Sequence, residues 1–381
     1  MLQAIKAMVL LIGNYPLDNQ PSMHRFAMMM LDGLAAAGVP AELIRPRPFF
    51  GRFRYAGSFI AKWLAYIDKF VLFRWQLRRK LKIVPALVHI CDHSNAIYAK
   101  HIRGVPVVAT CHDLLAVRGA LGEQADCPAS LTGKLLQRWI VSGLKAATAI
   151  SCVSEATLAD ARRLVIRQDG GPRLEIISLG LNYPYRELSP EESRARLAEY
   201  SVFMPGTPFV LHVGSNLRRK NREGVLRIFA RSKDQWDGSL VFAGEPLSNI
   251  LRSLARRLKI LNRVVEISDA PSELLEALYN CATALLFPST FEGFGWPIAE
   301  AQACGCPVIC TDREPMTEVA GNAGLTHDVE DEAGFAADLL RLTDPGERKH
   351  WSAKGLENAR RFSSSRMIAK YCELYRSLAP I

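Results

Sequence analysis

Two glutamates, Glu292 and Glu300, flank a loop with two glycines in the segment EGFGWPIAEAQACGCPV. A helix is predicted to begin near Pro297, because proline costs little where the amide has no intrahelical partner. Gly293 and Gly295 let the backbone come close to a ligand, and the helix N-terminus adds partial positive charge. A carboxylate can also accept two hydroxyl donors at once. This pattern is typical of a site for a phosphate or a sugar oxygen; the alternative is that both glutamates cap the helix and face solvent.

A basic loop follows the apolar stretch 209–215 in the sequence FVLHVGSNLRRKN. Its cations, Arg218, Arg219 and Lys220, would project from the carboxyl end of a predicted strand. Arginine offers a planar fork and lysine a point charge, and both suit a phosphate group. The alternative is a run of solvated charge.

Two other strand ends carry polar residues. His112 and Asp113 follow a predicted strand, although an isolated histidine in such a place is more often structural. Gly13 ends the first strand, and the loop after it offers several candidates for ligand contact: Asp18, Gln20, Ser22 and Arg25.

The cysteines and acidic clusters do not resemble a metal site. Cys304, Cys306 and Cys310 have the spacing C-x-C-x3-C with no histidine nearby, which favours small buried residues before a strand. The chain has nine cysteines, an odd and scattered set that favours thiols in a reducing cytoplasm. There is no D-x-D motif, and DVEDE at 328–332 is predicted to be a solvated loop. We therefore expect no metal and no cofactor.

Short apolar runs alternate with amphipathic helical stretches along the chain. One series lies at 7–15, 41–46, 86–92, 105–113, 148–154 and 174–180, and a second at 209–215, 239–245, 263–269, 282–289 and 307–312. This alternation is typical of parallel α/β sheets covered by helices on both faces. We predict two doubly wound, Rossmann-like domains facing each other across a cleft, with ligands at the carboxyl ends of the strands.

The glutamate loop, its glycines and proline, and the following A-x-A-x-G-x-P-V pattern together resemble the signature of retaining glycosyltransferases of family four. The resemblance is strong over 209–324 and loose before residue 105. It implies the GT-B fold, with an acceptor-side domain at 1–190 and a nucleotide-sugar domain at 191–362. The last helix is predicted at 357–378, and the resemblance implies that it crosses back, so that a C-terminal helix of about 363–381 belongs to the first domain.

The resemblance implies roles for the loop residues. Glu292, with the backbone of Gly293, Phe294 and Gly295, would hold the transferred sugar. Glu300 would hold the ribose hydroxyls of the nucleotide.

The family's basic loop, G-R-x4-K, is only partly kept. Gly214 and Lys220 have the right spacing, but Ser215 replaces the arginine. Lys220 and Arg219 would therefore meet the pyrophosphate, with Arg218 as a second candidate.

The remaining roles come from weaker parts of the resemblance. His112 would contact the sugar 6-hydroxyl, while Asp113 would fix its loop or face the acceptor. Only Gly13 remains of the family's G-G-x-x-R loop. The backbone around Ile267 and Ser268 would meet the base.

Positive charge is concentrated in the first half of the chain. Residues 1–190 carry 24 Lys+Arg and 13 Asp+Glu, whereas residues 191–381 carry 24 and 25. Segment 49–82 accounts for most of the excess, with nine basic residues and one acidic residue, Asp68, among ten aromatics. No stretch reaches 18 consecutive apolar residues, so no transmembrane helix is expected.

Within 49–82, Lys62 and Lys69 lie away from an apolar helical face. That face is formed by Ile60, Trp63, Ile67, Phe70 and Val71. A basic amphipathic helix of this kind suits an anionic membrane surface. The alternatives are an ordinary core helix with solvated lysines, or a surface for single-stranded nucleic acid. The nucleic-acid alternative does not account for the strand-end motifs, so no nucleic-acid partner is expected.

These observations predict a retaining hexosyltransferase that uses a nucleotide diphosphate sugar, with GDP-mannose as the first donor to try. The acceptor would be a hydroxyl of a glycan or lipid-linked molecule in cell-surface polysaccharide or glycolipid synthesis. We expect a cytoplasmic protein, peripheral on the inner face of the membrane if 49–82 binds lipid. The alternatives are an epimerase or phosphorylase on the same fold, or a non-enzymatic protein that binds membranes or nucleic acid.

Overall fold

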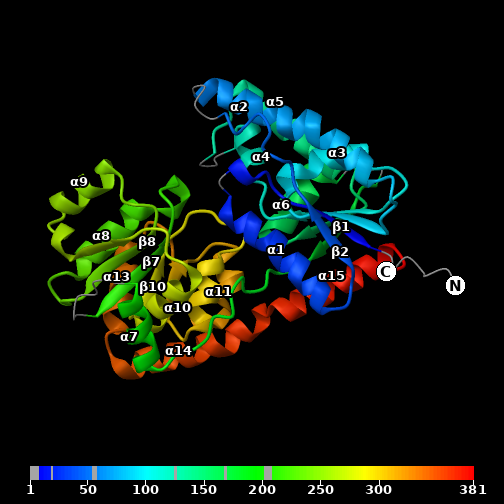
Figure 1. Ribbon diagram of the computed structural model, residues 1–381. Coiled ribbons are helices and arrows are strands. Elements are labelled where there is room, and N and C mark those ends of the chain that lie inside the picture. The colour runs from blue at the N-terminus through cyan, green and yellow to red at the C-terminus, as the bar shows by residue number, and fades with distance from the viewer. Residues whose placement is uncertain (1–7, 19, 54–57, 124–126, 167–169, 201–207) are drawn as a thin grey trace. The chain divides into compact units, whose positions relative to one another are not determined.

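The computed structural model describes residues 8–18, 20–53, 58–123, 127–166, 170–200 and 208–381, with side chains 58–62 left out (Figure 1). The chain divides into two compact units. Unit 1 comprises Met1–Asn182 and Ser364–Ile381, and unit 2 comprises Tyr183–Ser363. Each unit has a six-stranded parallel sheet with helices packed against it, which confirms the predicted α/β class with two Rossmann-like parts.

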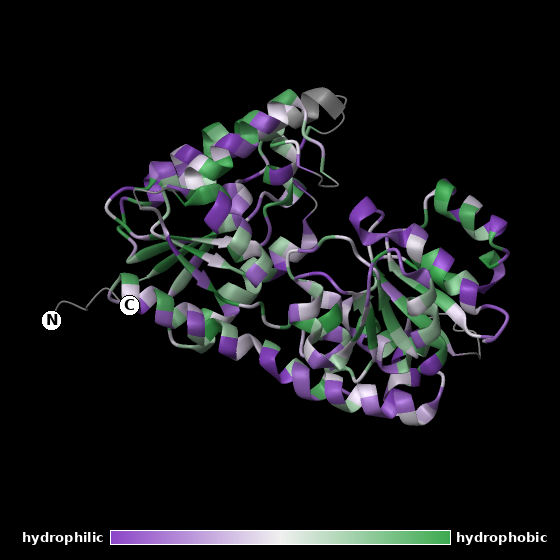
Figure 2. Cartoon of the chain, turned by 180° about the vertical axis from the view of Figure 1, so that it is seen from behind, coloured by the Kyte–Doolittle hydropathy of each residue, from purple (hydrophilic) through white to green (hydrophobic). Residues whose placement is uncertain are grey.

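The sheet of unit 1 has the strand order β2-β1-β3-β4-β5-β6. The order reverses at β1, which pairs with both β2 and β3. The central strands are buried along their whole length because helices cover both faces, and their mostly apolar residues appear as hydrophobic ribbons in Figure 2. The strands are β1 (Val9–Ile12), β2 (Ala41–Ile44), β3 (Leu87–Ile90), β4 (Val107–Cys111), β5 (Ala149–Cys152) and β6 (Arg173–Ile176).

The helices of unit 1 include one from the far end of the sequence. That helix, α15 (Ser364–Leu378), packs so closely on α1 (Pro21–Ala36) that a Cβ added to Gly33 would lie 2.4 Å from Ile368 Cγ1. Its Tyr371 hydroxyl lies 2.7 Å from Thr110 Oγ1 inside the sheet, and it is therefore an integral part of unit 1. The other helical segments are η1 (Pro16–Asp18), α2 (Ser58–Ile67), η2 (Asp68–Leu72), α3 (Phe73–Lys80), η3 (His93–His101), α4 (Leu115–Ala120), α5 (Leu131–Leu144) and α6 (Glu155–Val165).

The sheet of unit 2 has a different strand order, β12-β11-β10-β7-β8-β9. The chain moves outward from β7 to β9, returns to pair β10 with β7, and continues in the opposite direction. Ligands of doubly wound sheets bind beyond the carboxyl ends of the strands at such a reversal. The strands are β7 (Phe209–Gly214), β8 (Ser239–Gly244), β9 (Val264–Ile267), β10 (Ala284–Phe287), β11 (Val308–Thr311) and β12 (Gly324–His327), the last of which was not predicted.

The predicted helix 357–378 is interrupted. A short turn, η7 (Arg360–Phe362), and an extended Ser363 separate α14 from α15. Phe362 is buried against Phe294, with ring centroids 5.5 Å apart, and the serines that follow favour a helix start over a helix interior. The remaining helical segments of unit 2 are α7 (Pro190–Glu199), η4 (Arg218–Lys220), α8 (Arg222–Ser232), α9 (Asn249–Arg257), η5 (Leu261–Arg263), α10 (Ser272–Cys281), α11 (Trp296–Ala303), α12 (Met316–Ala320), η6 (Gly321–Ala323), α13 (Glu332–Arg341) and α14 (Pro345–Ala359).

Asp68, the single acidic residue of segment 49–82, lies in the π-helical turn η2 and is fully buried. Its carboxylate accepts hydrogen bonds from the Tyr15 hydroxyl at 2.7 Å and from the amides of Phe49, Phe50 and Gly51 at 3.1, 2.9 and 2.8 Å. A Cβ at Gly51 would collide with the Tyr15 hydroxyl at 2.0 Å. Asp68 therefore fixes the chain that precedes α2.

We expect Asp68→Ala to lower the free energy of unfolding by about 3 kcal/mol, because four buried or partly buried donors lose their acceptor. Urea denaturation measures the change. Asp328→Ala is the control, since Asp328 is an exposed carboxylate and should change stability by less than about 1 kcal/mol. Equal stabilities of the two variants would contradict this role.

Each sheet contains a fully buried histidine, His89 on β3 and His212 on β7. Burial lowers the pKa of each to about 3, so both are neutral in the folded protein at neutral pH. The unfolded chain takes up these protons below about pH 6.5. The free energy of unfolding should therefore fall by about 1.4 kcal/mol per pH unit for each histidine between pH 6 and pH 4.

Urea denaturation at pH 7.5, 6.0, 5.0 and 4.0 measures this slope. His350→Gln, at an exposed histidine of α14, should leave it unchanged. A stability independent of pH between 6 and 4 would show that these two histidines are not held neutral.

Candidate functional site

Two loops meet where the strand order of unit 2 reverses. The loop after β7 carries Arg219, and the loop after β10 carries Thr290, whose amide donates to the Arg219 carbonyl at 2.8 Å. The Asn221 side-chain amide donates to the Pro288 carbonyl at 3.1 Å. These contacts hold the two sequence-predicted motifs side by side.

Glu292 lies between two cations from the other loop. Arg219 Nη1 contacts Glu292 Oε2 at 2.5 Å, and Lys220 Nζ contacts Glu292 Oε1 at 2.6 Å. The Glu292 side chain is only 7% exposed. Burial alone would raise the pKa of Glu292, but the two cations lower it overall, so the carboxylate stays charged.

Lys220 is held by its neighbours along its length. A Cβ at Gly214 would lie 3.3 Å from Lys220 Cδ, so glycine at the end of β7 leaves room for the lysine. The ammonium lies 5.0 Å from the centre of the Phe287 ring. Burial lowers the pKa of Lys220 more than Glu292 raises it, so this cation is poorly solvated and would gain from a second anion.

Arg218 and Ser215 of the same loop are placed differently. Arg218 is exposed in η4, and the Ser215 side chain is half-buried directly after β7. Of the two candidate arginines, Arg219 is therefore the one that shares a carboxylate with Lys220.

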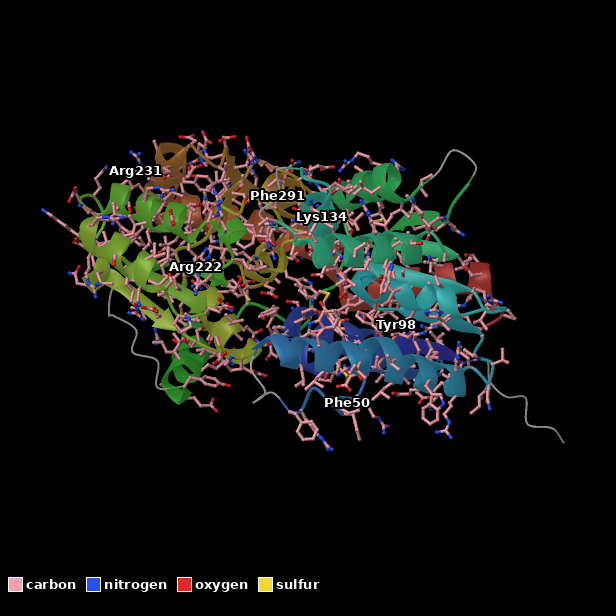
Figure 3. The ribbon with its side chains drawn as sticks, turned by 90° about the horizontal axis from the view of Figure 1, so that it is seen from above. Phe50, Tyr98, Lys134, Arg222, Arg231 and Phe291 are labelled. Carbon is pink, nitrogen blue, oxygen red and sulfur yellow. The ribbon has the colours of Figure 1, made fainter. Side chains whose placement is uncertain are left out.

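Two loop residues that the sequence did not point to shape this site. Asn221 has a positive φ of 49°, caps α8 by accepting from the Gly224 amide at 3.1 Å, and so turns the chain directly after Lys220. Arg222, labelled in Figure 3, is buried and donates to the Glu245 carbonyl at 2.7 Å and to the Gly214 carbonyl. It was missed because it is the fourth cation of RRKNR and resembles the solvated ones.

The second glutamate of the motif, Glu300, lies one turn into α11 and is 4% exposed. Its Oε2 accepts a hydrogen bond from the Tyr279 hydroxyl at 2.9 Å. Between the glutamates, Phe294 is buried, and Gly295 begins the helix with a φ of 96° that favours glycine. Gly293 precedes them in the loop.

The region proposed for the base lies at the carboxyl end of β9. Ile267 is 8% exposed and Ser268 is exposed. Glu266, directly before Ile267, accepts from the Leu247 amide at 2.8 Å and pairs with Arg252 at 2.9 Å. Its side chain therefore braces the loop after β8.

The candidates of unit 1 gather at the carboxyl ends of its strands. His112 is buried, and its Nε2 lies 2.9 Å from the Cys91 carbonyl, so Nε2 carries the proton. Burial lowers the pKa of His112, which favours the neutral ring. Asp113 accepts from the Leu115 amide at 3.1 Å, so it fixes the start of α4. These residues belong to a different unit from Glu292.

A polar network beside them was not anticipated. The Asn14 side chain donates to Asp92 and to Gln20, both at 2.5 Å, and Asn95 donates to Asn14 at 3.1 Å. A Cβ added to Gly13, just before it, would make a tight contact of 3.1 Å with Arg45 Nε. The sequence signal was CDHSN directly after a strand.

The other candidates in the loop after Gly13 lie outside this network. Asp18 pairs with Lys69 at 3.0 Å, while Ser22 and Arg25 are exposed in the first turns of α1.

Among the described residues, no group of three or more His, Cys, Asp or Glu side chains could hold a metal ion. Cys304, Cys306 and Cys310 are buried around the start of β11. The acidic stretch at 328–332 contains Asp331, which caps α13 by accepting from the Gly334 amide at 2.9 Å.

Comparisons with known proteins find a matching family model for each unit. Residues 23–182 match the family model Glycosyltransferase Family 4, and residues 194–357 match Glycosyl transferases group 1. O-antigen chain mannosyltransferase B of Escherichia coli is 30% identical over 238 residues, which are 58% of this chain and 62% of that protein. This chain thus spans less than two thirds of that relative's length.

Two solved structures share the fold. Sucrose-phosphate synthase from Thermosynechococcus elongatus has a TM-score of 0.78 at 20% identity, covering 97% of this chain and 98% of that one. Anabaena HepE in complex with UDP and glucose has a TM-score of 0.73 at 17% identity, covering 98% and 100%. With both family models matched in order along the sequence, the chain belongs to glycosyltransferase family 4, the glycosyl transferases group 1.

Proposed function

We propose that the protein is a retaining glycosyltransferase that moves a hexose from a nucleotide diphosphate sugar to an acceptor hydroxyl. One observation carries the proposal: Arg219 and Lys220 share the buried carboxylate of Glu292 at the strand-order reversal of unit 2. Cations stabilise a diphosphate, and a carboxylate accepts hydrogen bonds from sugar hydroxyls. Here each of the two cations lies within 2.6 Å of the carboxylate.

In the proposed reaction the bond between the anomeric carbon and the diphosphate oxygen breaks, and its electron pair leaves with the diphosphate. Lys220 and Arg219 stabilise the charge that develops there. The acceptor oxygen forms its bond to the anomeric carbon on the same face through an oxocarbenium-like state. The acceptor proton passes to the leaving phosphate oxygen, so no protein base is consumed.

Glu292 has two roles in this proposal. Without donor it neutralises the two cations, and with donor it accepts hydrogen bonds from the sugar hydroxyls while the cations turn to the diphosphate. Gly293, Phe294 and Gly295 supply the adjacent backbone, and Glu300 holds the ribose. In both states every buried charge has either an ion-pair partner or hydrogen bonds.

The donor we propose to test first is GDP-mannose, because a relative at 30% identity is named as a mannosyltransferase. UDP-glucose is second, because a protein of the same fold was solved with UDP and glucose. The proposed acceptor is a glycan or lipid-linked hydroxyl of a cell-surface polysaccharide or glycolipid.

A thermal-shift screen of nucleotide diphosphate sugars, followed by an assay for released nucleoside diphosphate, tests this function. Release that depends on an added glycan or lipid-linked acceptor is expected. Interconversion of sugars without acceptor would indicate an epimerase, and transfer from a sugar phosphate would indicate a phosphorylase.

Tyr279→Phe probes the proposed ribose contact. Removing the hydroxyl that orients Glu300 should raise the donor KM about three- to tenfold, with kcat changed less than twofold, because ground state and transition state lose the same contact. Tyr200→Phe, at an exposed tyrosine after α7, is the matched control. A fall in kcat at unchanged KM would place Glu300 at the reacting centre instead.

A further inference from the structure

Unit 1 exposes two apolar stripes on neighbouring helices. Trp63, Ile67, Val71 and Trp75 follow each other at four-residue steps along α2, η2 and α3, and all four are exposed. A second stripe at the same spacing runs along α5, with Leu131, Leu135 and Trp139 exposed. We call these seven residues the two-helix face.

The two stripes are parts of one surface. The Phe70 ring, next to Val71, meets the Trp139 ring edge-on with centroids 6.5 Å apart, which brings η2 beside α5. The opposite sides of both helices are anchored, since Phe73 and Leu77 of α3 and Ile140 and Leu144 of α5 belong to the same buried core. The two-helix face is therefore held outward by packing beneath it. Figure 2 shows hydrophobic and hydrophilic residues alternating along α2 and α3.

The exposed charges on the helices of the two-helix face have one sign, although Asp18 and Glu42 of other elements pair with Lys69 and Lys80. Arg78, Arg79, Lys134 and Arg138 are exposed on its helices, and Lys134 is labelled in Figure 3. Between 58 and 80 and between 131 and 144 the sequence has a single acidic residue, Asp68, and it is buried beneath the face. An anionic partner would meet no repulsive carboxylate on these helices.

Three of the chain's six tryptophans, Trp63, Trp75 and Trp139, lie on this face. Tryptophan favours the boundary between lipid headgroups and acyl chains, where basic side chains also meet anionic phosphates. The Arg79 guanidinium lies 4.0 Å from the centre of the Trp75 ring, so the ring and the cation would enter that boundary together. No helix among the described residues is long and apolar enough to cross a bilayer.

We propose that the two-helix face docks unit 1 on the surface of an anionic lipid bilayer. The sequence placed this property in 49–82, and the structure adds α5 as the second half of the surface. The buried side of segment 49–82, fixed by Asp68, joins the core, so the core-helix alternative describes only that side. Docking does not depend on the proposed transfer reaction and goes beyond it.

Co-sedimentation with vesicles of phosphatidylcholine containing 30% phosphatidylglycerol tests the proposal with the full chain. Lys134→Gln with Arg138→Gln should weaken binding about tenfold or more, since each charge contributes about fivefold. The matched control is Arg256→Gln with Arg257→Gln, two exposed arginines of α9 in unit 2, and it should bind like the wild type. Binding to pure phosphatidylcholine should be at least tenfold weaker.

The apolar contribution is tested separately. Trp75→Ser with Leu135→Ser should reduce vesicle binding about tenfold, whereas Ile250→Ser, at an exposed residue of α9, should not. Brominated lipids should quench tryptophan fluorescence in the wild type and less in the double variant. Unchanged donor affinity in these variants distinguishes docking from the proposed enzyme function.

Two results would overturn the proposal. One is vesicle binding that is equal in the α5 charge variant, its α9 control and the wild type. The other is a wild-type dimer that Trp75→Ser with Leu135→Ser converts to a monomer, which would make a second copy the occupant of this face.

Discussion

Lys220→Ala is expected to lower kcat about 100- to 1,000-fold, because a preorganised charge at a departing group contributes roughly this much. Lys220 lies 5.0 Å from the centre of the Phe287 ring and is poorly solvated, so in the proposed reaction its charge is held in place before the diphosphate leaves. Arg219 remains beside Glu292 in the variant, so the buried carboxylate keeps one partner and the fold should persist.

The control for Lys220→Ala is Lys349→Ala, which removes an exposed lysine from α14 and should leave kcat unchanged. Lys220→Arg should recover part of the loss, since it restores the charge without the compact ammonium. Initial rates at saturating donor give kcat directly. Full activity of Lys220→Ala, with circular dichroism like the wild type, would remove Lys220 from the reaction.

Glu292→Gln is expected to lower the transfer rate about 100-fold or more, although the substitution preserves shape. The amide accepts hydrogen bonds on one oxygen only, so the sugar loses a contact, and it no longer balances Arg219 and Lys220. The uncompensated cations should bind free nucleoside diphosphate at least as tightly as the wild type does. Loss of turnover with retained or tighter product binding is the signature of this site.

Isothermal titration with GDP and UDP, alongside initial rates, separates these two effects. Glu330→Gln, at an exposed glutamate between β12 and α13, should match the wild type in both. Since Glu292 and Lys220 are in contact, the double variant should lose much less than the product of the single losses. A loss of rate in the double variant equal to the product of the single losses would contradict the exchange of partners proposed here. Weaker diphosphate binding in Glu292→Gln would contradict it as well.

The fold class followed from the sequence because buried parallel strands are apolar without alternation, and this pattern is visible in a single chain. The short strand β12 was missed because GLTH has one buried residue in four. The interruption before α15 was also missed, since it depends on Phe362 packing on Phe294, a contact between distant parts of the chain.

The sequence named Glu292, Arg219 and Lys220 of the candidate site in unit 2, but it did not show that they pair. The contact of Glu292 with both Arg219 and Lys220 requires β10 to return beside β7, and strand order is not encoded in periodicity. Arg222 was overlooked because burial of a cation depends on carbonyl groups from two loops. Likewise, Asp92 was not recognised as a site residue because its hydrogen-bond partner, Asn14, follows a different strand.

The most direct test of the central claim is the anomeric configuration of the product, measured by NMR after turnover of GDP-mannose or UDP-glucose with a lipid-linked acceptor. We predict an α-linked product from the α-linked donor, formed with one nucleoside diphosphate per transfer and lost in Lys220→Ala. A β-linked product, or an α-linked product formed at the wild-type rate by Lys220→Ala, would contradict a retaining transferase built on the Glu292, Arg219 and Lys220 cluster.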